Sequence, residues 1–316
     1  TLEQLAQKLH ALVADTQTVL RVTETARQLP AQIRSVKERL DMRIAEERLI
    51  GAEIKPYAFL ERTDEQLQRM EHALRHGDAA QAAQIAEQLY AWMKDALEQV
   101  ERAVQARDWN TVTIGEIKEK LEEYDKHIFH ELHHHLSDLQ NRYVPDHWEE
   151  LPERIREIFD RCAEIAQTLP DLEKRNGPDI QEYFYVQESL RRINQTLGEM
   201  DAAARSVSET GAGLDRSYRE LANRYEEAVR QFEANQAEMR RHDLMADAAL
   251  LQMMGDSEQA LAAFRRALDQ TPRDLNEILF ASSATKAKLT AFTDALQTEI
   301  RRLNEAKRSI DDLERN

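Results

Sequence analysis

The sequence predicts an all-α fold, an elongated array of long antiparallel helices, and three observations support this. The 316 residues include only 8 Gly and 7 Pro, so few turns are expected. Aromatic residues make up 6% and charged residues 32% of the chain, which suits narrow apolar seams between helices better than a thick core. Apolar side chains recur in alternating steps of three and four residues, and no strand pattern competes with them.

Helix boundaries are predicted from the residues that break helices, chiefly Pro and Gly. The expected stops are Pro30, Gly51 with Pro56, Gly77 with Asp78, the stretch from Asp108 to Gly115, Pro145, the stretch from Pro170 to Pro178, Gly211 with Gly213, Gly255 with Asp256, and Pro272. The helices expected between them are residues 2–28, 31–50, 57–76, 79–107, 114–143, 147–168, 179–209, 214–254, 257–269 and 273–315.

Two of these helices carry clear seams of the coiled-coil kind. The first places Leu2, Leu5, Leu9, Leu12, Thr16, Val19, Thr23 and Ala26 on one stripe. The eighth places Leu214, Tyr218, Leu221, Tyr225, Ala228, Phe232, Asn235 and Met239 on another. The polar Asn235 is expected to fix the register of its helix at some cost in stability. Each helix should therefore bury one stripe against one or two neighbours, as in spectrin-like or coiled-coil helical bundles laid end to end.

The breaks divide the chain into an expected N-terminal helical bundle at residues 1–144 and a C-terminal helical bundle at residues 145–316, either separate or continuous as one rod. The segment Leu74–Ala82 recurs in similar form as Gln252–Ala260. Each copy predicts a tight helical hairpin, in which Gly ends one helix and Asp caps the next. Chance similarity within an Ala- and Gln-rich sequence is the alternative.

Net charge limits the classes of partner. Lys and Arg total 43 against 59 Asp and Glu, which gives a formal charge of −16. Such a surface repels phosphate backbones and anionic lipids, so neither nucleic acid nor direct membrane contact by this segment is expected. Other proteins, or further copies of the chain, are the expected partners. No cofactor is expected, because no phosphate-binding loop or Cys-x-x-Cys pair is present.

Cellular location is inferred from cysteine usage and from the ends of the chain. Cys162 is the one cysteine, so an intramolecular disulfide is impossible and a reducing, cytoplasmic compartment is favoured. Its place on an apolar stripe with Ile155, Phe159 and Ile165 predicts a buried small hydrophobe rather than a nucleophile. The chain begins at Thr1 inside a helical pattern, as expected of a piece of a longer protein, and a membrane anchor before Thr1 would tether it to the inner face of the membrane.

A histidine cluster between His127 and His135 offers the strongest signal for chemistry. Within it, His130, Glu131 and His134 match the H-E-x-x-H pattern of zinc peptidases, where two imidazoles bind the metal and the Glu activates water. At about 100° per residue, however, His130 and His134 lie roughly 200° and 240° from the apolar residue Ile128. They are therefore expected to face away from the packing stripe.

The cluster leaves three interpretations open. The favoured one is a polar helix face without metal, with no catalytic residue and no enzyme activity. An exposed His130/His134 pair that binds metal adventitiously is the second. The third is a helical zinc-dependent hydrolase with His130 and His134 as ligands and Glu131 as the catalytic base.

A short region resembles a known group of proteins. Its motifs are Ile54-Lys-Pro-Tyr-Ala-Phe-Leu60, Gln66-Leu-Gln-Arg-Met70 and the turn within Ala73–Ala82. They resemble the helical cytoplasmic regions of bacterial membrane-anchored coiled-coil proteins, such as the spectrin-like repeats of the septation-ring regulator EzrA and the coiled-coil tails attached to TPM domains. The resemblance implies a preceding anchor, a curved helical rod and a role in organising partners at the cell envelope or in cell division. It implies no catalytic residues.

These observations together favour a structural or interaction scaffold that binds protein partners through its helical faces. The zinc-dependent hydrolase is the alternative.

Overall fold

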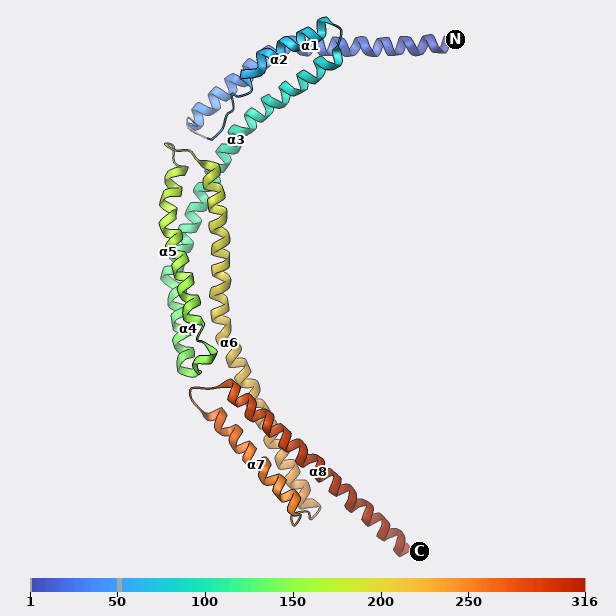
Figure 1. Cartoon of the computed structure of the whole chain (residues 1–316), viewed down its shortest axis with the longest axis vertical. Coiled ribbons are helices and arrows are strands. Elements are labelled where there is room, and N and C mark those ends of the chain that lie inside the picture. Colours follow the sequence, from blue (N-terminus) through green and yellow to red (C-terminus); the bar gives the residue numbers. More distant parts are fainter. Residues whose placement is uncertain (1, 50–52, 316) are drawn as a thin grey trace. The chain divides into compact units, whose positions relative to one another are not determined.

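The computed structural model describes residues 2–49 and 53–315, with side chains to residue 310, and its regular elements are helices (Figure 1). They are α1 (Leu2–Glu47), α2 (Leu60–Arg75), α3 (Ala79–Glu123), the π-helical turn η1 (Tyr124–Ile128), α4 (Phe129–Arg142), the 3₁₀ turn η2 (Pro145–His147), α5 (Leu151–Asn176), α6 (Tyr183–Arg241), α7 (Ala248–Asp269) and α8 (Leu275–Arg315). One isolated parallel bridge joins Tyr143 to Arg273, and the described residues contain no strand. The all-α prediction is confirmed. The predicted stop at Gly51, and Ile50 before it, lie outside the described residues.

Two compact units make up the structure. Unit 1 comprises Thr1–Glu122 and Cys162–Leu197, and unit 2 comprises Glu123–Arg161 and Gly198–Asn316. These units interleave along the sequence, whereas the expected bundles at residues 1–144 and 145–316 are consecutive. The consecutive division stays a prediction about which segments fold on their own. Within the described residues, no helix combines the length and the apolar character needed to cross a membrane.

In unit 1 a continuous apolar core joins α1, α2 and α3. It contains the fully buried Leu29 and Leu40 of α1, Met70 of α2, and Leu89 and Val100 of α3. Burial of a leucine-sized side chain stabilises a fold by about 1.5–3 kcal/mol, so this core outweighs several unfavourable local features. In unit 2 the aromatic residues Phe232 and Phe292 are part of a second core, formed by α6, α7 and α8.

Several predicted helix stops are wrong because helices continue through them. Pro30 lies inside α1 and Pro170 lies inside α5. A proline within a helix removes one hydrogen bond and costs about 3 kcal/mol relative to Ala. Both prolines are exposed and follow a buried leucine, Leu29 and Leu169 respectively. Packing of the buried face on either side of each proline offsets the local cost.

Glycines and polar residues likewise do not interrupt their helices. The stretch from Asp108 to Gly115 is helical within α3, and Gly211 and Gly213 both lie inside α6. At Gly211 an added Cβ would lie 3.4 Å from a methyl carbon of Leu139, so the small residue allows α6 to approach α4 closely within unit 2. Packing therefore explains this glycine better than a turn does.

The two predicted hairpins have different outcomes. At Gly77 the backbone has a φ of +77°, and the Asp78 carboxylate accepts a hydrogen bond from the amide of Gln81 at 2.9 Å, so this hairpin is confirmed. At Gly255 and Asp256 the prediction is wrong, because α7 runs through both residues. The chain instead reverses between α6 and α7, where Asp243 has a φ of 58° and Asp247 caps α7 through the amides of Ala249 and Leu250.

The π-helical turn η1 changes which residues face the core. Ile128 was expected on the packing stripe, but it is only half-buried and Phe129 is buried instead. In a π-helix the hydrogen-bonded residues are five apart, so Phe129 lies under Tyr124, with the two ring centroids 5.8 Å apart. The extra residue brings Phe129 and Leu132 onto the same buried stripe. In the regular α-helix α5, Ile158 is buried in place of the predicted Phe159, which is 55% exposed.

Candidate interaction surface

The N-terminal part of α1 exposes a row of large apolar side chains. Leu2 is 90%, Leu5 63%, Leu9 58% and Leu12 69% exposed. Figure 1 draws this segment, in blue, with no other helix beside it. Exposed apolar rows of this extent are uncommon on monomeric proteins and mark interaction sites. We call residues 2–20 of α1, with these leucines, Val13, Val19 and Leu20, the exposed stripe.

The exposed stripe continues directly into a buried interface. Further along α1 the apolar face turns partly round the helix: the spacing of the stripe leads to Ile33 and Leu40, and these are buried in the core of unit 1 together with Val22 and Leu29, which come one residue before the positions that the spacing gives. Here the stripe packs against α2 and α3. The apolar side of α1 is therefore covered in the second half of the helix and uncovered in the first. The chemistry of the exposed half matches that of the half that already binds helices.

Charged residues flank the exposed stripe sparsely. Residues 2–20 contain two acidic residues, Glu3 and Asp15, and one basic residue, Lys8. Val13 and Leu20, exposed at 50% and 64%, widen the apolar surface beyond the predicted seam. The predicted seam leaves out these two residues and the flanking charges, although heptad positions next to a seam are where such residues are found.

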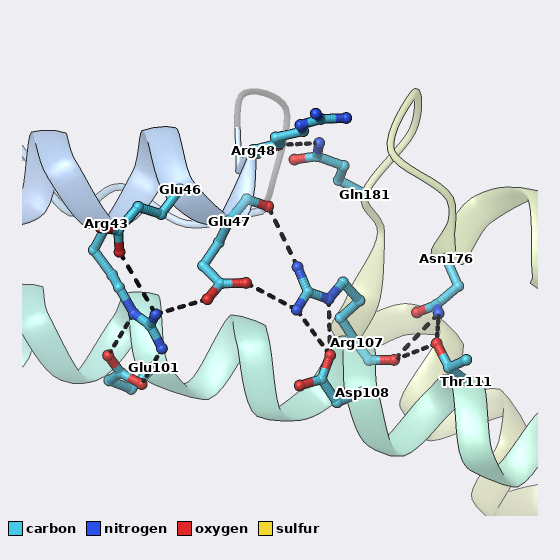
Figure 2. Close-up of polar contacts among 10 residues, drawn as sticks. All are labelled: Arg43, Glu46, Glu47, Arg48, Glu101, Arg107, Asp108, Thr111, Asn176 and Gln181. Atoms are coloured by element: carbon cyan, nitrogen blue, oxygen red, sulfur yellow. Dashed lines mark hydrogen bonds and ion pairs between the residues drawn. The ribbon is translucent and has the colours of Figure 1, made fainter.

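At the other end of α1, ionic contacts fix the helix to α3 (Figure 2). Arg43 pairs with Glu101 at 3.1 Å and with Glu47 at 2.7 Å. Arg107 of α3 pairs with Glu47 at 2.9 Å and donates a second hydrogen bond to the backbone carbonyl of Glu47 at 3.3 Å. That carbonyl belongs to the last residue of α1, where a positive charge stabilises the helix end.

A buried amide network joins α3 to the connection between α5 and α6 in unit 1. The Asn110 side chain donates to the Asn176 side chain and to the Tyr183 carbonyl, each at 2.8 Å. Asn176 in turn donates to Thr111 at 3.1 Å (Figure 2). Gln181 donates to the carbonyl of Arg48 at 2.7 Å, just beyond the end of α1. The bonds of Asn110 and Asn176 thus fix α3, on which α1 packs, and the bond of Gln181 holds the chain just beyond the end of α1.

Tyr57 adds a further contact to α1. Its hydroxyl donates to the Asp41 carboxylate at 2.5 Å. Burial, together with this hydrogen bond and the nearby negative charge, raises the pKa of Tyr57 to about 12. The phenol is therefore protonated and acts as a donor throughout the physiological pH range.

The histidine cluster lies on the surface of α4 in unit 2. His130, Glu131 and His134 are exposed, while Phe129 and Leu132 occupy the buried face. Over residues 2–49 and 53–315, no three His, Cys, Asp or Glu side chains lie close enough together to hold a metal ion. The geometry thus offers His130 and His134 as a pair of surface imidazoles, with Glu131 between them in sequence.

Cys162 is buried in α5 and forms no disulfide. Its 8% exposure agrees with the prediction of a buried small hydrophobe, and Ile155 and Ile165 of the predicted stripe are buried as well.

Comparison of this chain with protein-family models, with curated proteins and with solved structures gives no match. The resemblance of residues 54–82 to EzrA-like helical regions therefore stays a prediction.

Proposed function

We propose that this chain is a structural or interaction scaffold that binds partner proteins by helix-on-helix packing at the exposed stripe of α1. The observation that supports this proposal is that α1 buries apolar side chains on α2 and α3 from Val22 onward and exposes a row of them from Leu2 to Leu20. Amphipathic helices that lay one apolar face on another are a common mode of protein recognition.

Crosslinking in the cells that produce the protein tests this proposal. A photo-reactive residue replaces Leu9 on the stripe or, as a matched control, Gln7 on the polar face. Position 9 should give discrete protein adducts and position 7 should give none. A second variant, Leu5→Asp with Leu12→Asp, should abolish the adducts from position 9, because buried carboxylates oppose helix packing. Equal adducts from both positions, or none from position 9, would contradict the proposal.

The proposed cellular setting is the cytoplasm, with the chain tethered to the inner face of the membrane by a segment before Thr1, in an envelope or cell-division role. The absence of cysteine pairs and the resemblance of residues 54–82 support it. Fractionation of the native protein checks this setting. Recovery from the periplasm or the medium would rule it out.

Metal analysis separates the scaffold from the zinc-dependent hydrolase. The protein is treated with a chelator, dialysed against zinc and assayed for bound metal, as wild type and as His134→Ala. A scaffold without a zinc site retains less than one equivalent in both forms. Stoichiometric zinc in the wild type that is lost in His134→Ala would instead favour the hydrolase with His130, His134 and Glu131.

A further inference from the structure

The exposed stripe of α1 has a heptad pattern that complements itself. Leu2, Leu9 and Thr16 occupy the first core position of the heptad, and Leu5, Leu12 and Val19 occupy the second. The flanking positions hold Lys8 and Asp15 on one side. On the other side they hold Ala6, Val13 and Leu20. One flank is therefore charged with both signs, and the other is apolar.

We propose that the exposed stripe docks on the same stripe of a second copy of this chain, with the two helices antiparallel. This inference rests on the proposed function and names the partner. The two-fold axis would pass between Leu9 and Leu12. In that register Leu9 packs against Leu12 of the partner subunit, Leu5 against Thr16 of the partner subunit, and Leu2 against Val19 of the partner subunit. Every core position of the stripe has a partner, and the assembly closes as a dimer.

Charge complementarity selects the antiparallel arrangement. In antiparallel pairs, each flank faces the same flank of the other helix. Lys8 then faces Asp15 of the partner subunit, and the two-fold axis repeats this ion pair. A parallel pair would instead place Lys8 opposite Val13 of the partner subunit and Asp15 opposite Leu20 of the partner subunit, with no ion pair.

Two further observations favour a second copy. The heptad position of Leu5, Leu12 and Val19 recurs at the buried Ile33 and Leu40, which already pack on helices of unit 1, so a second helix on residues 2–20 would add to an existing interface of α1. The chain carries a net charge of −16, but residues 2–20 hold only two acidic residues and one basic residue. Two copies therefore meet with little repulsion at this segment. Pairing also stabilises a helix that would otherwise be marginal in water.

The mass of the full chain, measured by sedimentation over a concentration series, tests the proposal. The wild type should change from one copy to two as concentration rises. Leu9→Asp with Leu12→Asp should remain a single copy throughout, whereas Gln7→Asp, on the polar face, should dimerise like the wild type. Circular dichroism reports whether each variant retains its helices. A wild type that stays a single copy, or a dimer that survives Leu9→Asp with Leu12→Asp, overturns the proposal.

Charge exchange tests the orientation without altering the apolar core. Lys8→Asp alone and Asp15→Lys alone each create two like-charge contacts, so each should weaken dimerisation by about ten-fold. A mixture of these two variants restores both ion pairs, and so does the double variant Lys8→Asp with Asp15→Lys. Both should regain wild-type affinity. Failure of both rescues overturns the antiparallel register.

The proposed function and this inference fail separately. A wild type that stays a single copy while Leu9 crosslinks to a different polypeptide refutes self-docking and leaves the scaffold function standing. A single copy with no adduct from Leu9 refutes both.

Discussion

At the scale of single residues, the buried amide of Asn110 is a sensitive point of unit 1. Its side chain is completely buried and serves the Asn176 side chain and the Tyr183 carbonyl. Asn110→Ala leaves both acceptors buried without their donor. We expect a loss of about 1–3 kcal/mol in the free energy of unfolding, measured by urea denaturation with tryptophan fluorescence. Gln105→Ala, at an exposed position of α3, should change it by less than about 0.5 kcal/mol. Equal effects would contradict the role of this network.

Asp215 gives unit 2 a defined acid sensitivity. Its carboxylate accepts hydrogen bonds from Arg142 at 2.5 Å and Tyr143 at 2.7 Å. The Arg142 hydrogen bond is the largest influence, and with that of Tyr143 it outweighs burial and lowers the pKa of Asp215. The folded state then binds a proton less readily than the unfolded state, whose pKa is about 3.9. The stabilisation is complete above that value and is lost as the pH falls through the lower, folded-state pKa.

We therefore expect Asp215→Asn to reduce the free energy of unfolding by about 1.5–3 kcal/mol near neutral pH. The difference from the wild type should shrink progressively below about pH 4. Urea denaturation at several pH values measures it, with Asp160→Asn as an exposed control for the change in charge. A difference that grows on acidification would contradict the assignment.

Sequence reasoning located some of these residues and not others. Asn235 was recognised because a lone polar residue interrupts an apolar seam, and its amide donates to Thr293 at 2.9 Å. The exposure of His130 and His134 followed from helical geometry. Asn110 was missed because its partners lie 66 and 73 residues away along the sequence, and no local sequence pattern indicates contacts at that separation. A role for Lys8 and Asp15 can be inferred only after the structure shows that the stripe beside them is exposed.

At the scale of helices, Gly and Pro predicted helix ends correctly where the chain reverses direction. They predicted them wrongly where packing of the helix outweighs the local preference of these residues. Gly77 and Pro145 both lie at real connections. Pro30 and Gly211 carry the same local signal, yet their helices continue because the faces on either side are buried. The reversal at Asp243 was missed because aspartate adopts the left-handed conformation there in place of glycine.

The π-helical turn η1 leads us to expect different stability costs for two single-residue deletions. Removal of Asp125, an exposed residue within η1, converts the turn to regular α-helix and keeps Phe129 and Leu132 on the buried stripe. We expect it to change the free energy of unfolding by less than about 1.5 kcal/mol. Removal of Glu119, an exposed residue of α3, rotates the following residues by about 100° and moves apolar side chains off that stripe. This deletion should cost more than about 4 kcal/mol. Equal costs in thermal or urea denaturation would contradict the account of η1.

At the scale of the whole molecule, the all-α fold followed from composition and periodicity, because a chain with few Gly and Pro and regular apolar spacing has few other ways to bury its side chains. Composition and periodicity did not predict which apolar stripes are covered by other helices. The seam predicted on the first helix covers Leu2 to Ala26, and the spacing of its residues gave no reason to expect that most of it is exposed. That distinction depends on how far along α1 the hairpin of α2 and α3 reaches.

Amide hydrogen exchange along α1, measured at increasing protein concentration, tests the central claim most directly. Residues 22–44 should exchange slowly at every concentration, because α2 and α3 cover them. Residues 2–20 should exchange fast in dilute solution and slow down as copies pair. Slow exchange of residues 2–20 at the lowest concentration would mean that the stripe is already covered. Fast exchange at the highest concentration would mean that no second copy docks on it.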